Sequence, residues 1–310
     1  MSAVPGAGAI VLVNPHAGGG RAGRMAGHIA RELAALAPRV ELALPEGIEQ
    51  ARALIRSRPA GSRVVLAGGD GTVQPMLQAL VQGQLELGLV PMGSGNDTAR
   101  ALGLHGLGWR DALAQALLAA AAPMDLGECR VEGRPVLFIS SLAAGFDASV
   151  GHRAREGPAW LRGLPRYLAA TLGELRVLQD AHLRVELDGQ VVHEGRSLFA
   201  SALNSRTYGG GMPAAPDARI DDGRLDALVA GRFGRAATLL MLPRLLAGRH
   251  LSHPRVQVRT FQQMRVSSQL PCRLAADGEP AGQACLWEVG VCPGALQAVR
   301  RPAQARQSRS

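Results

Sequence analysis

Aromatic side chains are scarce in this sequence, and their scarcity narrows the functions that it can serve. Phe, Tyr and Trp make up 3% of the 310 residues, although 47% are hydrophobic, so the cores must be built from Leu, Val and Ala. The net charge is +9 and is carried by arginine, but few rings are present to stack on bases and the arginines are scattered. We therefore expect no nucleic-acid partner. An acidic membrane surface or a phosphorylated substrate suits the charge better.

Cysteine and long apolar runs are also sparse. The four cysteines, Cys129, Cys272, Cys285 and Cys292, lack C-x-x-C spacing, which disfavours a cysteine metal site and predicts a reduced, cytoplasmic protein. The N-terminus has no basic stretch ahead of an apolar run, so no signal peptide is expected. No apolar window reaches the ~20 residues of a transmembrane helix. Any membrane contact is therefore expected to be peripheral, at the inner face of the membrane.

Glycine, in contrast, is abundant at 39 residues, and it is concentrated in a Gly-Gly-Asp-Gly-Thr stretch over residues 68–72. An apolar run over 63–67 precedes this stretch, and apolar residues at near-helical spacing follow it over 73–80. The pattern predicts a buried strand, a tight turn and the start of a helix. Such a helix start suits a phosphate. Asp70 would repel a bare phosphate, so we expect it to act through a cation or a positioned proton; an ordinary Gly-Asp-Gly turn is the alternative.

Two further strand ends carry polar, glycine-rich turns. The apolar run 9–13 ends at Asn14, before three glycines at 18–20, and the run 85–90 leads into Gly93-Ser94-Gly95-Asn96-Asp97. Another strand is expected at 40–44, with helices at 21–36 and 48–57. Strands that alternate with helices up to about residue 122 predict an α/β domain with a parallel sheet covered on both faces. Ligands in such sheets bind outside the carboxyl ends of the strands.

After Pro123 the pattern changes to strands joined directly by turns, which predicts a mostly antiparallel β domain. One helix is expected at about 158–178 and another at about 235–248. The tail 303–310 is polar and basic, and we expect it to be disordered. The expected strands cover residues 125–131, 134–142, 181–187, 191–203, 225–230, 256–259, 264–267, 273–276 and 284–291.

The motifs, taken together, resemble the diacylglycerol kinase catalytic family, which includes bacterial lipid kinases and sphingosine kinases. GGDGT alone is less specific, because NAD kinases also use it. The matching pieces occur in the family's order between about residues 9 and 294. They are Asn14-Pro15 with Gly18–Gly20, Gly68–Thr72, Gly93–Asp97, Ala144–Asp147, Gly209–Gly211 with Pro213 and Pro216, Ile220–Gly223 and Asp277–Glu279.

The resemblance implies a nucleotide-binding domain over residues 1–123, to which a segment at about 292–302 returns. A lipid-binding β-sandwich domain over 124–291 would complete the molecule, with ATP in the cleft between the two. The implied activity is transfer of the γ-phosphate of ATP to a lipid hydroxyl, most simply that of diacylglycerol or a related lipid. A homodimer is left open.

The resemblance also assigns site residues. Asp70 and Asp97 would hold the catalytic Mg²⁺, and Glu279 would be the general base that takes the proton of the lipid hydroxyl. A structural Mg²⁺ would bind the carboxylate of Asp222 and the backbone carbonyls of Arg219 and Arg224. The residues expected to contact the nucleotide are Asn14, Gly68, Gly69, Asp70, Gly71, Thr72, Val73, Gln74, Gly93, Ser94 and Asn96.

Three departures from the family pattern bear on these assignments. Gln74 stands where the common relative has Asn, Ser94 where many have Thr, and Ala43 where some have a nucleotide-contacting Thr. They affect single contacts to the nucleotide and leave the proposed Mg²⁺ ligands and the base in place. A plain β-turn over Asp277-Gly278-Glu279-Pro280 remains the alternative for the last motif.

Two other functions stay open from the sequence. NAD kinase-like phosphorylation of a soluble dinucleotide accounts for GGDGT alone, and a non-catalytic nucleotide-binding membrane sensor would not need all three acids. Asp147 is expected either to order the cleft or to cap a strand end, and Ser140-Ser141 to be structural. A basic and apolar helix could meet anionic headgroups or be a plain solvated face; its residues are Arg153, Arg155, Trp160, Leu161, Arg162, Leu164, Arg166 and Tyr167.

Overall fold

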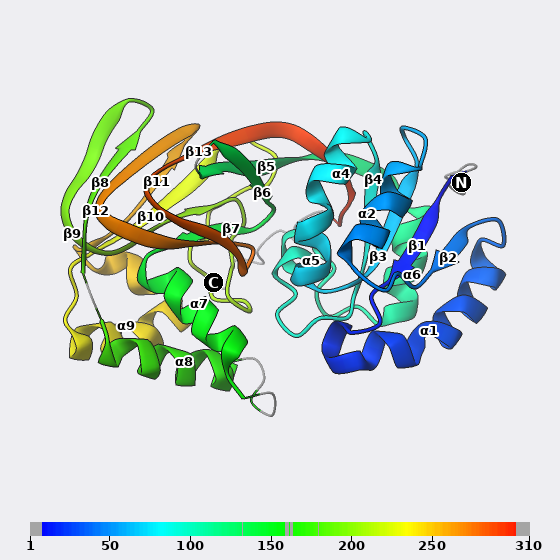
Figure 1. Ribbon diagram of the computed structural model, residues 1–310, viewed down its shortest axis with the longest axis horizontal. Coiled ribbons are helices and arrows are strands. Elements are labelled where there is room, and N and C mark those ends of the chain that lie inside the picture. The colour runs from blue at the N-terminus through cyan, green and yellow to red at the C-terminus, as the bar shows by residue number, and fades with distance from the viewer. Residues whose placement is uncertain (1–7, 132, 159–160, 162–163, 179, 302–310) are drawn as a thin grey trace, which may run out of the picture.

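A computed structural model describes residues 8–131, 133–158, 161, 164–178 and 180–301 of the chain. Its N-terminal part is a parallel sheet in the order β4-β3-β1-β2 with helices on both faces, as expected (Figure 1). The strands are β1 (Ile10–Val13), β2 (Glu41–Ala43), β3 (Arg63–Gly68) and β4 (Glu86–Pro91). The helices are α1 (Ala17–Leu36), α2 (Ile48–Arg56), α3 (Asp70–Val73), the 3₁₀ turn η1 (Gln74–Met76), α4 (Leu77–Gln82), α5 (Asp97–Ala101) and α6 (Trp109–Leu118).

The parallel strands are apolar throughout because both faces of the sheet are covered. Ile10 and Leu12 of β1 pack into one core with residues of α2 and α4. Val11 and Val13 pack into a second core with residues of α1 and α6. Successive side chains of a strand point to opposite faces, so a continuous run such as Ile-Val-Leu-Val feeds both cores. The polar turns are left at the strand ends.

The C-terminal part is a mostly antiparallel β domain. It has one large core, which includes Phe138, Phe261 and Trp287. Its strands are β5 (Ala121–Val131), β6 (Arg134–Phe138), β7 (Ser141–Ala144), β8 (Ala181–Leu187), β9 (Gln190–Leu203), β10 (Leu225–Gly231), β11 (Val256–Phe261), β12 (Gln263–Ala276) and β13 (Glu279–Val299). Its helices are α7 (Phe146–Glu156), α8 (Leu164–Arg176), α9 (Arg235–Leu246) and the 3₁₀ turn η2 (His250–Ser252).

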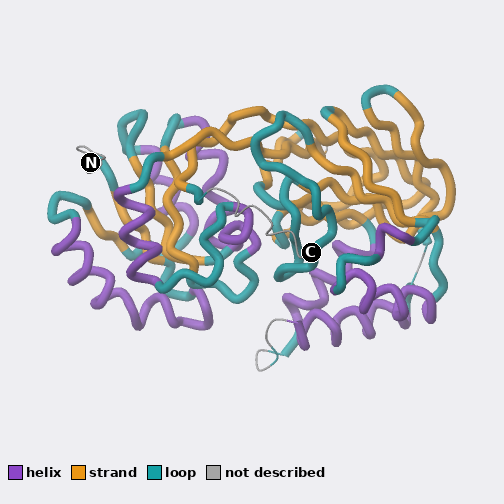
Figure 2. The backbone as a smooth tube through the Cα atoms, turned by 180° about the vertical axis from the view of Figure 1, so that it is seen from behind, coloured by secondary structure: helices purple, strands orange, loops and turns teal. Residues whose placement is uncertain are grey.

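One long strand, β13, joins the two parts. It pairs antiparallel with β12 and β5, and near its end Gln297 and Ala298 pair parallel with Glu86 and Leu87 of β4. The hydrogen-bonded path of strands therefore runs from one part of the molecule into the other, as Figures 1 and 2 show from opposite sides. This path fixes how the strand ends of the N-terminal sheet face the C-terminal domain.

Three elements differ from the sequence-based expectations. The strand expected over 134–142 is split into β6 and β7, and β12 is one strand with irregularities where two were expected. Helix α7 was not expected, because its sequence, Phe-Asp-Ala-Ser-Val-Gly-His-Arg-Ala-Arg-Glu, has little apolar periodicity. No helix in the described part of the chain is long and apolar enough to cross a membrane. The expected tail, 303–310, lies outside the described residues.

Candidate active site

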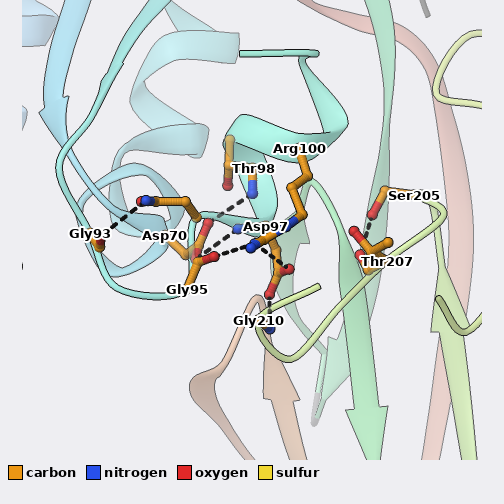
Figure 3. A network of polar contacts seen from close by, with 10 residues as sticks. Asp70, Gly93, Gly95, Asp97, Thr98, Arg100, Ser205, Thr207 and Gly210 are labelled. Atoms are coloured by element: carbon orange, nitrogen blue, oxygen red, sulfur yellow. Dashed lines mark hydrogen bonds and ion pairs between the residues drawn. The ribbon is translucent and has the colours of Figure 1, made fainter. Parts of the chain in front are cut away.

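The Gly-Gly-Asp-Gly-Thr turn follows β3 and leads into α3, as its sequence predicts. The carboxylate of Asp70 accepts backbone hydrogen bonds from Thr98 N at 2.8 Å and Asp97 N at 3.1 Å (Figure 3). These amides belong to the first turn of α5, where helix N–H groups have no partner within the helix. Asp70 thus ties the turn after β3 to the turn after β4.

The two turns pack against each other through glycine. A Cβ at Gly69 would lie 2.7 Å from the Cα of Gly93, closer than real Cβ contacts allow. Asn96 has a left-handed φ of 56° at the N-cap of α5, and its Nδ2 donates to the carbonyl of Gly93 at 2.9 Å. Its Oδ1 is buried without a hydrogen-bond partner among the described residues. The carbonyl oxygen of this amide is therefore a buried acceptor without a donor in the described part of the chain.

The turn after β1 contacts the turns after β3 and β4. Asn14 Nδ2 donates to Thr72 Oγ1 at 2.8 Å, so this asparagine braces the Gly-Gly-Asp-Gly-Thr turn from the side. Gly18, Gly19 and Gly20 all have left-handed φ, and a Cβ at Gly18 would lie 2.3 Å from the carbonyl oxygen of Met92. Only glycine fits that approach, so the backbones of the turns after β1 and β4 come into close contact at Gly18.

Asp97 is held from both parts of the molecule. Its Oδ2 accepts a hydrogen bond from Gly210 N at 2.7 Å, and its Oδ1 lies 3.4 Å from Arg100 Nη1 (Figure 3). Burial raises its pKa to about 6; the Gly210 amide opposes that rise, and the charge of Asp70 adds to it. Two neighbouring carboxylates with a raised pKa on one of them form a site that a cation would stabilise.

Glu279 begins β13, directly after the tight turn at Asp277 and Gly278, whose φ values are 50° and 82°. A Cβ at Gly71 would lie 2.8 Å from Glu279 Oε1, so this oxygen faces the Gly-Gly-Asp-Gly-Thr turn. The other oxygen, Oε2, pairs with Arg155 Nη1 of α7 at 2.5 Å. The structure therefore places the acids 70, 97 and 279 around one set of turns.

Asp277 has a role that the sequence did not suggest. Its carboxylate accepts backbone hydrogen bonds from Ile139 at 2.7 Å, Ser140 at 2.7 Å and Ser141 at 3.0 Å. Burial raises its pKa to about 7, against the opposing effect of the three amides. These bonds engage the backbone amides of residues 139–141, where the expected strand is split into β6 and β7. They anchor the turn that carries Glu279.

The remaining residues predicted to contact the nucleotide differ in which of their atoms a ligand could reach. Val73 is fully buried in the core, so only its backbone is available to a ligand. Gln74 Nε2 donates to the carbonyl of Leu137 at 3.2 Å, so this side chain links the two parts of the molecule. Ser94 is exposed at the tip of the turn after β4.

The loop of the expected structural Mg²⁺ is a separate place in the fold. Asp222 Oδ1 accepts a hydrogen bond from the backbone of Arg224 at 3.1 Å, while Arg219 pairs with Asp221. The carboxylate of Asp125, which the sequence did not suggest, accepts from Gly223 N at 2.7 Å and Gly294 N at 2.8 Å. That carboxylate holds the loop against the returning strand β13.

The acids of the site suit a Mg²⁺ ion that arrives with a nucleotide. Among the described residues no group of three or more His, Cys, Asp and Glu side chains could hold a metal by itself. Magnesium keeps several waters and is usually bound by one or two carboxylates together with substrate phosphates. Asp70 and Asp97 could supply two such carboxylates, although each already accepts contacts from protein donors.

An apolar cavity of about 60 Å³ lies in the C-terminal domain between α8, α9 and the sheet. Phe146, Phe233 and Leu242 contribute to its apolar wall. Its polar side is Asp147, which accepts hydrogen bonds from Tyr167 at 3.2 Å and Ser201 at 3.3 Å. Burial raises the pKa of Asp147 to about 6. Asp147 therefore belongs to a buried polar network at the cavity.

Three arginines of the segment that could meet headgroups or form a plain solvated face have protein partners. Arg153 pairs with Glu174 of α8 at 2.5 Å, and Arg155 pairs with Glu279. Arg166 donates to the carbonyl of Gly157 at 2.6 Å. The side chains of Trp160, Arg162 and Leu164 lie outside the described part of the structure.

The fold defines the class of protein. Over 96% of this chain and 98% of the other, it superimposes on a diacylglycerol kinase from Bacillus anthracis with a TM-score of 0.72 at 18% identity. It also matches an NAD kinase from Archaeoglobus fulgidus solved with ATP, with a TM-score of 0.54 at 14% identity over 95% and 94% of the two chains. The architecture is therefore that of the diacylglycerol and NAD kinases.

Sequence comparison identifies the family. The diacylglycerol kinase catalytic domain matches residues 8–129, and the YegS C-terminal NAD kinase beta sandwich-like domain matches 140–300. A diacylglycerol kinase of Mycobacterium tuberculosis H37Rv is 33% identical over 239 residues, 76% of each chain. One of Bacillus subtilis is 25% identical over 71% of each chain. The chain belongs to the diacylglycerol kinase catalytic family, a family of phosphotransferases, and this membership implies use of ATP.

Proposed function

We propose that this protein is an ATP- and Mg²⁺-dependent lipid kinase that transfers the γ-phosphate to a hydroxyl of diacylglycerol or a related lipid. The observation that carries the proposal is the position of Glu279. This acid comes from the C-terminal domain, yet its Oε1 faces the Gly-Gly-Asp-Gly-Thr turn of the N-terminal domain. A base beside a phosphate-binding turn is the arrangement that phosphoryl transfer to an alcohol needs.

The three turns supply the triphosphate site in this proposal. Glycines at 68, 69, 71 and 93 let phosphates approach the backbone N–H groups, and Asn14 keeps Thr72 in place. Asp70 and Asp97 would hold Mg²⁺, with Asn96 Oδ1 close by. Bound there, the ion would neutralise charge on the phosphates. Arg219, Asp222 and Arg224 remain the proposed site of a second, structural Mg²⁺.

Glu279 would accept the proton of the attacking hydroxyl while the alcohol oxygen forms its bond to the γ-phosphorus and ADP leaves. Oε1 is the oxygen turned toward the phosphate turn, so it is the proposed proton acceptor. Arg155 occupies Oε2 and fixes the rotation of the carboxylate. Asp277 anchors the turn beneath it through three backbone amides.

The apolar cavity supports a lipid acceptor over a soluble dinucleotide. Its wall is almost wholly apolar, whereas a dinucleotide would need polar partners for its riboses and phosphates. This cavity of about 60 Å³ is the proposed place for an acyl chain of the acceptor. We propose that the protein works in the cytoplasm and takes its acceptor from a membrane at its surface.

Incubation of the purified protein with labelled ATP, Mg²⁺ and a lipid panel tests the proposal. We expect a phosphorylated lipid whose formation is lost in the Glu279→Gln variant. Mass analysis of products from a total lipid extract would identify the acceptor. Phosphorylation of NAD with no labelled lipid would establish the dinucleotide alternative, and ATP binding without any turnover would establish the sensor alternative.

A further inference from the structure

Exposed apolar side chains gather on one surface of the C-terminal domain. In the part of the chain that the structure describes, eleven large hydrophobic residues are exposed, and six of them lie on or beside α8, α9 and η2. A concentration of this kind on a surface indicates a site of contact with a partner or a membrane. We call it the α8–α9 surface; its exposed apolar residues are Leu172, Val177, Leu239, Leu240, Leu246 and Leu251.

The two helices form one surface because they lie side by side. Arg235, at the start of α9, donates from Nη2 to the carbonyl of Arg176, at the end of α8, at 2.9 Å. Figures 1 and 2 both show the helices next to each other at the edge of the domain. The exposed leucines therefore belong to neighbouring elements.

Helix α9 is apolar on both of its sides. Thr238, Met241, Leu242 and Leu245 recur at helical spacing and line the apolar cavity. Leu240, on the opposite side of the helix, is 73% exposed. An exposed leucine on a helix that already packs on its other side favours contact with a further apolar neighbour. The inner side of α9 lines the cavity and is partly buried there, whereas Leu240 on the outer side is exposed beside Arg244.

The charge on this surface is positive. Helix α9 contains no acidic residue, and α8 contains one, Glu174, which pairs with Arg153. Asp180, just beyond α8, pairs with Arg232. Four arginines of the same elements are exposed: Arg176, Arg235, Arg244 and Arg249. Exposed leucines among exposed arginines complement an anionic bilayer, where leucines enter the interface and arginines meet headgroups.

We propose that the α8–α9 surface docks on an anionic lipid bilayer. The proposal rests on the proposed function, since a kinase that phosphorylates a membrane lipid must reach it there. Docking would place the outer side of α9 in the interface while its inner side still lines the apolar cavity. A lipid chain that moves from the bilayer into the cavity would then cross only the layer formed by α8 and α9.

Sedimentation of the full chain with vesicles, in the absence of ATP, tests docking without reference to catalysis. Vesicles of phosphatidylcholine with phosphatidylglycerol should bind the protein, more weakly at high salt, and vesicles of phosphatidylcholine alone much less. Leu240→Gln should weaken binding about tenfold, as expected for an apolar side chain removed from a lipid contact. Arg244→Gln should weaken it about fivefold.

Matched controls separate this surface from general changes in charge or polarity. Leu270→Gln replaces a leucine of β12 that is 64% exposed, and Arg39→Gln removes an exposed arginine beyond α1. Both should bind vesicles like the wild type. Docking is overturned if Leu240→Gln and Arg244→Gln bind normally, if Leu270→Gln weakens binding equally, or if sedimentation velocity shows that Leu240→Gln breaks a dimer.

A kinase assay distinguishes failure of docking from failure of the proposed function. The Leu240→Gln/Arg244→Gln variant should phosphorylate a short-chain diacylglycerol dispersed in water at the wild-type rate, and diacylglycerol in anionic vesicles far more slowly. Vesicle binding without phosphorylation of any lipid would remove the kinase proposal and leave docking. Normal phosphorylation of vesicle diacylglycerol by the double variant would remove docking and leave the kinase.

Discussion

The acidic residues of the two parts of the molecule have different surroundings. In the N-terminal part, Asp70 and Asp97 lie at strand ends among backbone amides and glycine turns. In the C-terminal part, the carboxylates of Asp147 and Asp277 accept hydrogen bonds from protein donors, and Glu279 Oε1 faces the Gly-Gly-Asp-Gly-Thr turn. In the proposed reaction the N-terminal part would bind the charged phosphate donor, and the C-terminal part would supply the base and an apolar acceptor site.

This difference teaches that neither part holds the proposed site alone. Contacts across the boundary assemble it: Gly210 N to Asp97, Glu279 against Gly71, and Gln74 to the Leu137 carbonyl. Strand β13 holds both sides in one sheet path. The substitutions below test whether the N-terminal part binds ATP while the C-terminal part supplies the base.

Glu279→Gln should cause the largest loss. An amide cannot take the proton of the attacking hydroxyl, so kcat should fall about 10²- to 10⁴-fold while ATP binding, assigned to the other part, stays unchanged. Steady-state kinetics and calorimetric titration with ATP measure the two effects. Glu288→Gln, on the same strand and exposed, is the control. If Glu279→Gln weakened ATP binding as much as it lowered kcat, ATP binding could not be assigned to the N-terminal part alone.

Gly71→Ala should act on the contact between the parts. The new Cβ would lie 2.8 Å from Glu279 Oε1, so the base must shift. We expect kcat to fall about ten- to a hundredfold, because small displacements of reacting groups are costly. Gly27→Ala is the matched control, since its Cβ would meet nothing within 4 Å inside α1. An unchanged kcat for Gly71→Ala would place the working base elsewhere.

Asp147→Asn should change how stability depends on pH. Burial raises the pKa of Asp147 from 3.8 to about 6, so between these values the folded state binds more protons than the unfolded state. Its contribution to the free energy of unfolding therefore falls as pH rises through this range and is constant above it. The wild type should lose about 2 kcal/mol relative to the variant between about pH 4.5 and pH 7.5.

Urea denaturation at several pH values measures that difference. Asp111→Asn, at an exposed aspartate of α6, should run parallel to the wild type. A wild type that gains stability over the Asp147→Asn variant as pH rises would contradict the raised pKa, and with it the contrast between buried and open acids.

Arg155→Gln should have the smallest effect. Arg155 fixes one oxygen of Glu279, but its side chain is 45% exposed, so solvent screens the ion pair. We expect kcat to fall roughly fivefold with the KM for ATP unchanged, with partial recovery in Arg155→Lys and no further loss in the Glu279→Gln background. Arg153→Gln, which breaks a similar pair to Glu174, is the control. A raised KM for ATP would make Arg155 a nucleotide contact instead.

Much of the fold could be predicted because local pattern and burial coincide. The apolar runs before residues 14, 68 and 93 became β1, β3 and β4, and the α/β and antiparallel parts are confirmed. The prediction was weakest where local pattern carries little signal, as in α7. The break between β6 and β7 depends on Asp277, which lies far along the chain.

The residues of the candidate site could also be predicted only in part. The sequence pointed to Asp70, Asp97 and Glu279 through motifs and resemblance, and their assigned roles stay predictions. It missed Asp277 as an anchor and missed the pairing of Arg155 with Glu279, because a partner more than a hundred residues away leaves no mark on local spacing.

By itself the sequence determined the strand-turn-helix units, the glycine turns and the family, since these depend on residues that are neighbours in the chain. Tertiary structure alone decided which oxygen of Glu279 faces the turn, which acids are buried, and where exposed leucines collect beside arginines. Those features depend on distances in space and on access of water, which arise only when the chain folds; the approach of Glu279 to the turn also needs the two parts that β13 joins.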